Sequence, residues 1–127
     1  MSFGLDLEEF QKKVEDKAEK IRRGATIDLF SSIMLGTPVD TGRLRGNWTI
    51  STPSREKEVF DEIDESGKTA LDRSTKEAAK STKDNPIYIL NNVHYAAHVE
   101  KMDVGGMVRT NVARWEDIVS SVASTLK

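Results

Sequence analysis

Apolar residues recur at steps of three and four from Leu5 to Leu35, which places them on one face of a predicted α-helix. The positions are Leu7, Phe10, Val14, Ala18, Ile21, Ala25, Leu29 and Ile33. A helix over residues 5–35 would be about 45 Å long, whereas a compact domain of 127 residues is only about 35 Å across. We therefore expect this helix either to bend, at Gly24, or to extend beyond the rest of the domain.

The helix must end at residues 37–48, which read TPVDTGRLRGNW. Pro38 fixes its own φ and disfavours helical geometry in the residue before it. The side chains of Asp40 and Thr41 can bond to nearby backbone N–H groups, and Gly42 can adopt a positive φ without steric cost. We predict a tight turn in which Gly42 has a positive φ.

Two arginines, Arg43 and Arg45, follow this turn and carry rigid, always charged groups. We expect them to pair with carboxylates, either of this chain or of a neighbouring copy. A DNA-binding strip that combines them with Arg22, Arg23 and Arg109 is less favoured, because acidic residues lie among the arginines of the first helix and no ladder of aromatic residues accompanies them.

The remaining elements are two strands and a second helix. Residues 47–51 (NWTIS) alternate and are rich in β-formers, and residues 87–90 form a continuous apolar run, so we expect the two to pair antiparallel. Residues 107–126 are amphipathic, with Val112, Trp115, Val119, Val122 and Leu126 on one face. The predicted fold class is α+β: a long N-terminal helix, a small antiparallel sheet and a C-terminal helix packed on that sheet.

Residues 54–85 lie between the strands and contain few apolar residues per turn. We expect a weakly packed helix or a mobile insertion here, within a single domain that spans residues 1–127. The expected core consists of the apolar stripe of the first helix together with Trp48, Ile50, Ile87, Ile89, Val112, Trp115, Val119 and Val122.

Composition excludes several classes of function. The net charge of −2 gives no overall attraction to nucleic acid or to an acidic membrane, and the absence of cysteine excludes disulfides and thiolate chemistry. No apolar run reaches the length of a membrane span and no secretory signal opens the sequence, so we expect a cytoplasmic protein. Because no nucleophile elbow, phosphate-binding loop or apolar pair of glutamates is present, we expect no enzymatic activity.

His94 and His98 are four residues apart, with Glu100 and Asp103 nearby. On a helix, two such histidines share a face and can hold a divalent metal. The glutamate that zinc peptidases carry beside the first histidine is missing, and no third ligand lies at a specified spacing. We therefore expect neither a metal nor another cofactor.

Two blocks of this sequence resemble the head–tail joining family of tailed bacteriophages, the neck or tail-completion proteins that include the lambdoid minor tail protein Z type. The matching residues are Pro38, Asp40, Thr41, Gly42, Arg43, Leu44, Arg45 and Trp48 in the first block, and Asn91, Asn92, Tyr95 and Glu100 in the second. His94 stands where the family often has proline, and residues 101–103 replace a glycine that usually follows the glutamate closely. Residues 106–109 (GMVR) resemble the start of the family's last helix.

The resemblance implies a structural virion protein that joins the capsid to a long tail as one ring of the neck. It implies a hexameric ring of copies of this chain, in contact with the head-closure or connector protein on one side and with the tail terminator or tail tube protein on the other. DNA would only pass through the lumen, no membrane would be involved, and the protein would move from the host cytoplasm into the virion. The alternative is a small cytoplasmic regulatory or binding module that uses the N-terminal amphipathic helix as a partner face.

Overall fold

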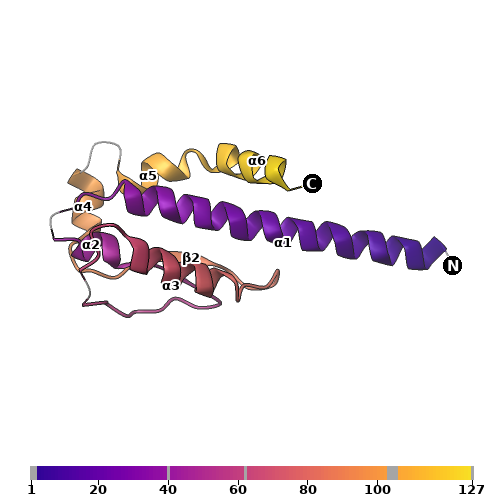
Figure 1. The fold of residues 1–127 in the computed structure, drawn as a ribbon, viewed down its shortest axis with the longest axis horizontal. Helices are drawn as coiled ribbons and strands as arrows, with labels where there is room; N and C mark the ends of the chain where they lie inside the picture. Colours follow the sequence, from indigo (N-terminus) through magenta and orange to yellow (C-terminus); the bar gives the residue numbers. More distant parts are fainter. Residues whose placement is uncertain (1–2, 40, 62, 103–105, 127) are drawn as a thin grey trace.

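The structure is a computed structural model and describes residues 3–39, 41–61, 63–102 and 106–126. It confirms the α+β class, with a long N-terminal helix, a two-stranded antiparallel sheet and a C-terminal helix (Figure 1). The elements are α1 (Phe3–Leu35), α2 (Arg43–Gly46), β1 (Trp48–Ser51), α3 (Lys68–Ala78), β2 (Tyr88–Asn91), α4 (Ala96–Met102), α5 (Met107–Val112) and α6 (Trp115–Thr125).

Helix α1 is continuous through Gly24, and its N-terminal part extends beyond all the other elements (Figure 1). Gly24 serves another purpose, because a Cβ at this position would lie 2.8 Å from Cγ1 of Val122 in α6. The glycine therefore allows α6 to approach α1 closely. The expectation that the whole stripe is core is wrong for Leu7, Phe10 and Val14, which are 51%, 66% and 51% exposed because no described element packs there. It is also wrong for Ala18, which is exposed.

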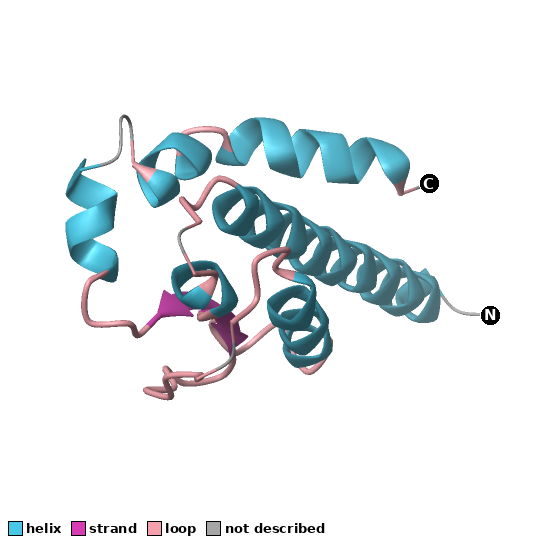
Figure 2. Ribbon diagram, turned by 60° about the vertical axis from the view of Figure 1, so that its left-hand side comes forward, coloured by secondary structure: helices cyan, strands magenta, loops and turns pink. Residues whose placement is uncertain are grey.

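The C-terminal helix packs along α1, on the side opposite the sheet and α3, and not on the sheet as predicted (Figures 1 and 2). The predicted single helix is also divided, since a turn at residues 113–114 separates α5 from α6. This turn changes the face that meets α1, so that Ile118 is buried, whereas Val112 and Trp115 are 48% and 36% exposed. Placing these last two residues in the core was wrong for this reason.

The core lies between the C-terminal half of α1, the sheet and α3. Strand β1 pairs with β2 in the predicted antiparallel arrangement, with Trp48 opposite Asn91 and Ile50 opposite Ile89. The buried cluster combines Phe30, Ile33 and Met34 of α1 with residues from the sheet and from α2, α3 and α5. Three of the largest fully buried side chains, Phe30, Ile33 and Met34, therefore come from the part of α1 that other elements cover.

Residues 54–85 differ from the weakly packed insertion that we predicted. Helix α3 lies against β1 and α1, and its Ala70, Ser74 and Ala78 are buried. The Ser74 hydroxyl accepts a hydrogen bond of 3.1 Å from the backbone N–H of Ile50. Small side chains let α3 approach the sheet closely, which a count of large apolar residues cannot reveal. Residues 54–59 of this segment are continuously exposed and form neither helix nor strand.

Candidate functional site

The two blocks of the family resemblance meet around one cavity of about 540 Å³, which we call the end cavity. It lies at the end of the molecule that carries α2 and α4, opposite the projecting N-terminus of α1 (Figure 1). Its lining consists of Pro38, Val39, Thr41, Gly42, Arg43, Leu44, Tyr95 and Val99. Asp40, which also belongs to the first block, lies outside the described residues.

Gly42 shapes the wall of the end cavity through its backbone. Its φ is +91°, which confirms the predicted positive value. A Cβ at this position would lie 2.7 Å from the backbone nitrogen of Glu65 and 2.9 Å from the carbonyl carbon of Asp64. The Gly42 carbonyl accepts hydrogen bonds from the N–H groups of Gly46 and Asp64 at 2.9 and 3.3 Å. Both the conformation and the close approach of the segment before α3 therefore require glycine.

The two arginines of the first block have different partners. Arg45 donates to three backbone carbonyls of its own chain: to Glu65 at 2.6 Å, Leu35 at 3.0 Å and Thr37 at 3.1 Å. It joins the end of α1 to the segment before α3, so the carboxylate partner that we expected for it is replaced by carbonyl oxygens.

Arg43 instead remains at the rim of the end cavity. Its guanidinium lies 3.8 Å from the Asp61 carboxylate, and the two side chains are 40% and 100% exposed. A long ion pair this exposed contributes little to stability. Arg43 is therefore the arginine of this block that could take a carboxylate from another molecule.

Trp48 and its neighbour Asn47 anchor the start of β1. The Trp48 indole N–H donates to the Thr37 hydroxyl at 2.7 Å, and that hydroxyl donates to the Ile33 carbonyl at 2.8 Å. The Asn47 amide donates to the Phe60 carbonyl at 2.9 Å and accepts from its N–H at 2.6 Å. Asn47 was not predicted as a site residue, although an amide between a turn and a strand is a suitable group for pairing with a passing backbone.

Asp64, which sequence reasoning also missed, fixes the start of α3 beside Gly42. Its buried carboxylate accepts hydrogen bonds of 3.0 Å from the N–H groups of Gly67 and Ala70. An acidic residue shortly before a helix was the available sequence signal, because a carboxylate there can satisfy the free N–H groups of the first turn.

The asparagines of the second block connect it to the rest of the fold. The Asn91 amide donates to the Leu44 carbonyl at 2.8 Å, and its oxygen accepts from the Val93 N–H at 3.2 Å. The Asn92 amide donates to the carbonyls of Glu56 and Glu58 at 3.0 and 3.1 Å. The first of these residues thus ties the second block directly to the first.

Tyr95 and the histidines lie near the same end of the molecule. Tyr95 is half-buried in the cavity wall, and its ring meets that of His94 edge-on at 5.1 Å between centroids. His94 lies in the turn before α4, whereas His98 is on α4, and both are exposed. Among the described residues no group of three His, Cys, Asp or Glu could hold a metal, and Asp103 lies outside them.

Glu100 forms a compact polar corner between α4 and α5. Its carboxylate accepts from the N–H of Val108 at 2.8 Å, and from the N–H and Nε of Arg109 at 3.2 and 3.0 Å. Arg109 also donates to the Glu100 carbonyl at 2.8 Å. Burial raises the pKa of Glu100, but these hydrogen bonds and the Arg109 charge outweigh it, so that the pKa lies below its ordinary value. Gly106, with φ +77°, leaves room for this carboxylate at the start of α5.

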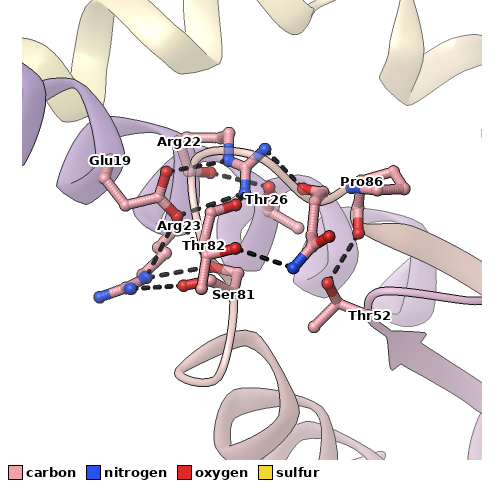
Figure 3. A network of polar contacts seen from close by, with 9 residues as sticks. Glu19, Arg22, Arg23, Thr26, Thr52, Ser81, Thr82 and Pro86 are labelled. Atoms are coloured by element: carbon pink, nitrogen blue, oxygen red, sulfur yellow. Dashed lines mark hydrogen bonds and ion pairs between the residues drawn. The ribbon is translucent and has the colours of Figure 1, made fainter.

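Arg22 and Arg23, two of the arginines that we weighed for a DNA-binding strip, are engaged within the fold (Figure 3). Arg22 donates to the Thr82 and Asn85 carbonyls at 2.6 and 3.0 Å, and Arg23 donates to the Ser81 carbonyl at 2.6 Å. Glu19 lies between them, with ion pairs of 3.3 and 3.4 Å to the two arginines. This network fastens the loop after α3 to the middle of α1.

None of the described helices is both long enough and apolar enough to cross a membrane. Comparison of the chain with protein-family models, with curated proteins and with solved structures found no match.

Proposed function

We propose that this chain is a structural protein of a long-tailed bacteriophage, a subunit of the neck or tail-completion ring that joins the capsid to the tail. The family proposal comes from the two blocks that surround the end cavity. The observation that carries an assembly function is the projecting part of α1, where Leu7, Phe10 and Val14 are exposed on one face. A contiguous apolar face of this kind marks a surface that another molecule covers.

The mechanism is assembly without chemistry. Copies of the chain form a hexameric ring around the DNA channel in the host cytoplasm and pass into the virion. One side of the ring recognises the head-closure or connector protein, and the other recognises the tail terminator or tail tube protein. A subunit with a net charge of −2 suits a channel through which DNA must pass, because a strongly basic lumen would retain the phosphates.

The second candidate is a small regulatory or binding module that pairs through α1. The same exposed face favours it, because a stripe with helical spacing can meet a partner helix as in a coiled coil. The two candidates differ in the size of the complex: a hexameric ring and a helical dimer differ several-fold in mass.

The test combines sedimentation equilibrium with an in vitro assay that joins isolated phage heads to tails prepared without this protein. The proposal expects a ring-sized complex and restored joining. A two-chain complex that does not restore joining would favour the binding module. A matched control is Lys12→Ala, an exposed change on the opposite face of α1, which should leave both measurements unchanged.

A further inference from the structure

We propose that the end cavity of one subunit receives the projecting N-terminal part of α1 from a second copy of the chain. The contact would be head-to-tail, with a different surface used on each copy. This inference rests on the proposed function, since it specifies how the ring is built.

The inserting part is the face of α1 that carries Leu7, Phe10 and Val14. These residues follow one another at steps of three and four, so they lie on one side of the helix. Phe10 is the most exposed of them, at 66%. The helix projects past α3 and α6 (Figure 1), so another molecule can reach this face without displacing a described element.

The receiving part is concave and largely apolar. Val39, Leu44, Tyr95 and Val99 contribute apolar surface to the end cavity, whose volume of about 540 Å³ lies within the range of pockets that enclose a ligand. Two more exposed apolar residues lie at this end of the molecule: Leu35, which ends α1, and Met102, which ends α4.

The charges beside the two surfaces are complementary. Lys17 follows Phe10 by seven residues, so it lies on the same side of α1 as the inserting apolar residues, and it is exposed. Asp61 is fully exposed and is held loosely by Arg43 of the end cavity, at 3.8 Å. The Lys17 ammonium of the incoming helix can therefore pair with Asp61 as the apolar residues enter the cavity.

The placement of the two surfaces allows copies of the chain to join head-to-tail. The cavity and the projecting helix lie at opposite ends of the subunit (Figure 1), so each copy can bind one neighbour and be bound by another. Such a heterologous contact generates a ring when the rotation closes. A contact between two α1 faces would instead be isologous and would end at a dimer.

Cysteine crosslinking tests this geometry, because the chain has no cysteine of its own. We would place one cysteine beside the inserting face, in Gln11→Cys, and one in the cavity wall, in Thr41→Cys; both positions are exposed. The variants would be oxidised separately and as a mixture, at concentrations up to about 1 mM, where contacts with millimolar dissociation constants are populated. The proposal expects a crosslinked pair in the mixture only.

Three results would overturn the proposal. They are no crosslink in the mixture, a crosslink of Gln11→Cys with itself, which indicates pairing of two α1 faces, and a crosslink of Thr41→Cys with itself. If the chain forms rings and joins heads to tails while one of these results is obtained, the proposed function stands and only this contact is wrong.

The second measurement is the dissociation constant of the assembly. Phe10→Ala should weaken it by at least about tenfold, as expected for a central aromatic anchor, and Lys12→Ala should leave it unchanged. Thermal unfolding of both variants should match that of the parent chain, because both side chains are exposed. Equal assembly by Phe10→Ala and the parent would overturn the proposal.

Discussion

The two halves of α1 share one helical pattern but have different environments. In the C-terminal half, Phe30, Ile33 and Met34 are buried beneath the sheet, α3 and α5. In the N-terminal half, Leu7 and Phe10 belong to the same apolar stripe as the buried Ala25 and Ile33, but they are exposed. Sequence periodicity shows that a helix has an apolar face, but it does not show whether the cover for that face belongs to the same chain.

The strongest test of this comparison is to remove one phenylalanine from each half. Phe30→Ala should lower the free energy of unfolding by about 3–5 kcal/mol, because it leaves a cavity in the core. Phe10→Ala should change it by less than about 0.5 kcal/mol, as for other exposed positions. Urea unfolding of the free subunit measures both. If both variants lost a similar free energy of unfolding, the N-terminal half of α1 would have to be covered in the free chain as well.

Gly42→Val tests the segment that packs at the C-terminal end of α1. We expect a loss of more than about 2 kcal/mol, because valine tolerates neither the positive φ nor the contact with the Asp64–Glu65 backbone. Thr41→Val introduces the same side chain one residue earlier, at an exposed position, and should cost less than about 1 kcal/mol. Thermal unfolding distinguishes the two, and equal melting temperatures would contradict the close packing at Gly42.

Gly24→Leu tests the cover that α6 provides. The new side chain would overlap Val122, so we expect a loss of about 1–3 kcal/mol as α6 is displaced. Ala18→Leu, at an exposed position on the same stripe, is the matched control and should be nearly neutral. Hydrogen exchange of the α6 amides should quicken in the first variant alone. Unchanged protection there would argue against close contact between the two helices.

Glu19→Ala tests the polar boundary between the two halves. Glu19 pairs with Arg22 and Arg23 and accepts a hydrogen bond from the Ser81 hydroxyl at 2.9 Å. We expect a loss of about 1–2 kcal/mol and faster exchange in residues 79–86. Glu8→Ala, in the exposed N-terminal half of α1, should have neither effect. If it lowered the free energy of unfolding as much as Glu19→Ala does, the two halves of α1 would not differ as described.

The smallest expected effect is the pH dependence of stability that comes from Glu100, whose carboxylate holds the start of α5. The folded-state pKa of Glu100 lies below its ordinary value, so its stabilising contribution is present above the unfolded-state pKa and disappears as the pH falls through the folded-state pKa. Glu100→Gln should therefore lower stability at neutral pH, and the difference from the parent should vanish in acid. A difference that persists unchanged in acid would show that the charge is not responsible.

Local patterns predicted the long helix, the strand pair and the positive φ of Gly42, because each depends on a few neighbouring residues. The burial of α3 was missed because Ala70, Ser74 and Ala78 pack through their small size and not through large apolar surface. The role of Arg45 depends on the segment before α3 lying next to it, where the Glu65 carbonyl accepts its hydrogen bond. The spacing of residues 37–48 does not predict that contact. At the end cavity, the lining residues all lie within two stretches, residues 37–48 and 89–100, but only the fold shows that these stretches meet.

The packing of α6 on α1 has a consequence for synthesis of the chain. Ile118 and Val122 pack on α1 but are made about 80 residues after its last turn. At about 5–20 residues per second, the ribosome needs roughly 4–16 seconds to produce them. During that interval the α6-facing side of the C-terminal half of α1 is as uncovered as the N-terminal half. Nascent chains on the same message then present longer apolar faces to one another than finished chains do, so slow translation of the last third of the chain should favour aggregation over folding.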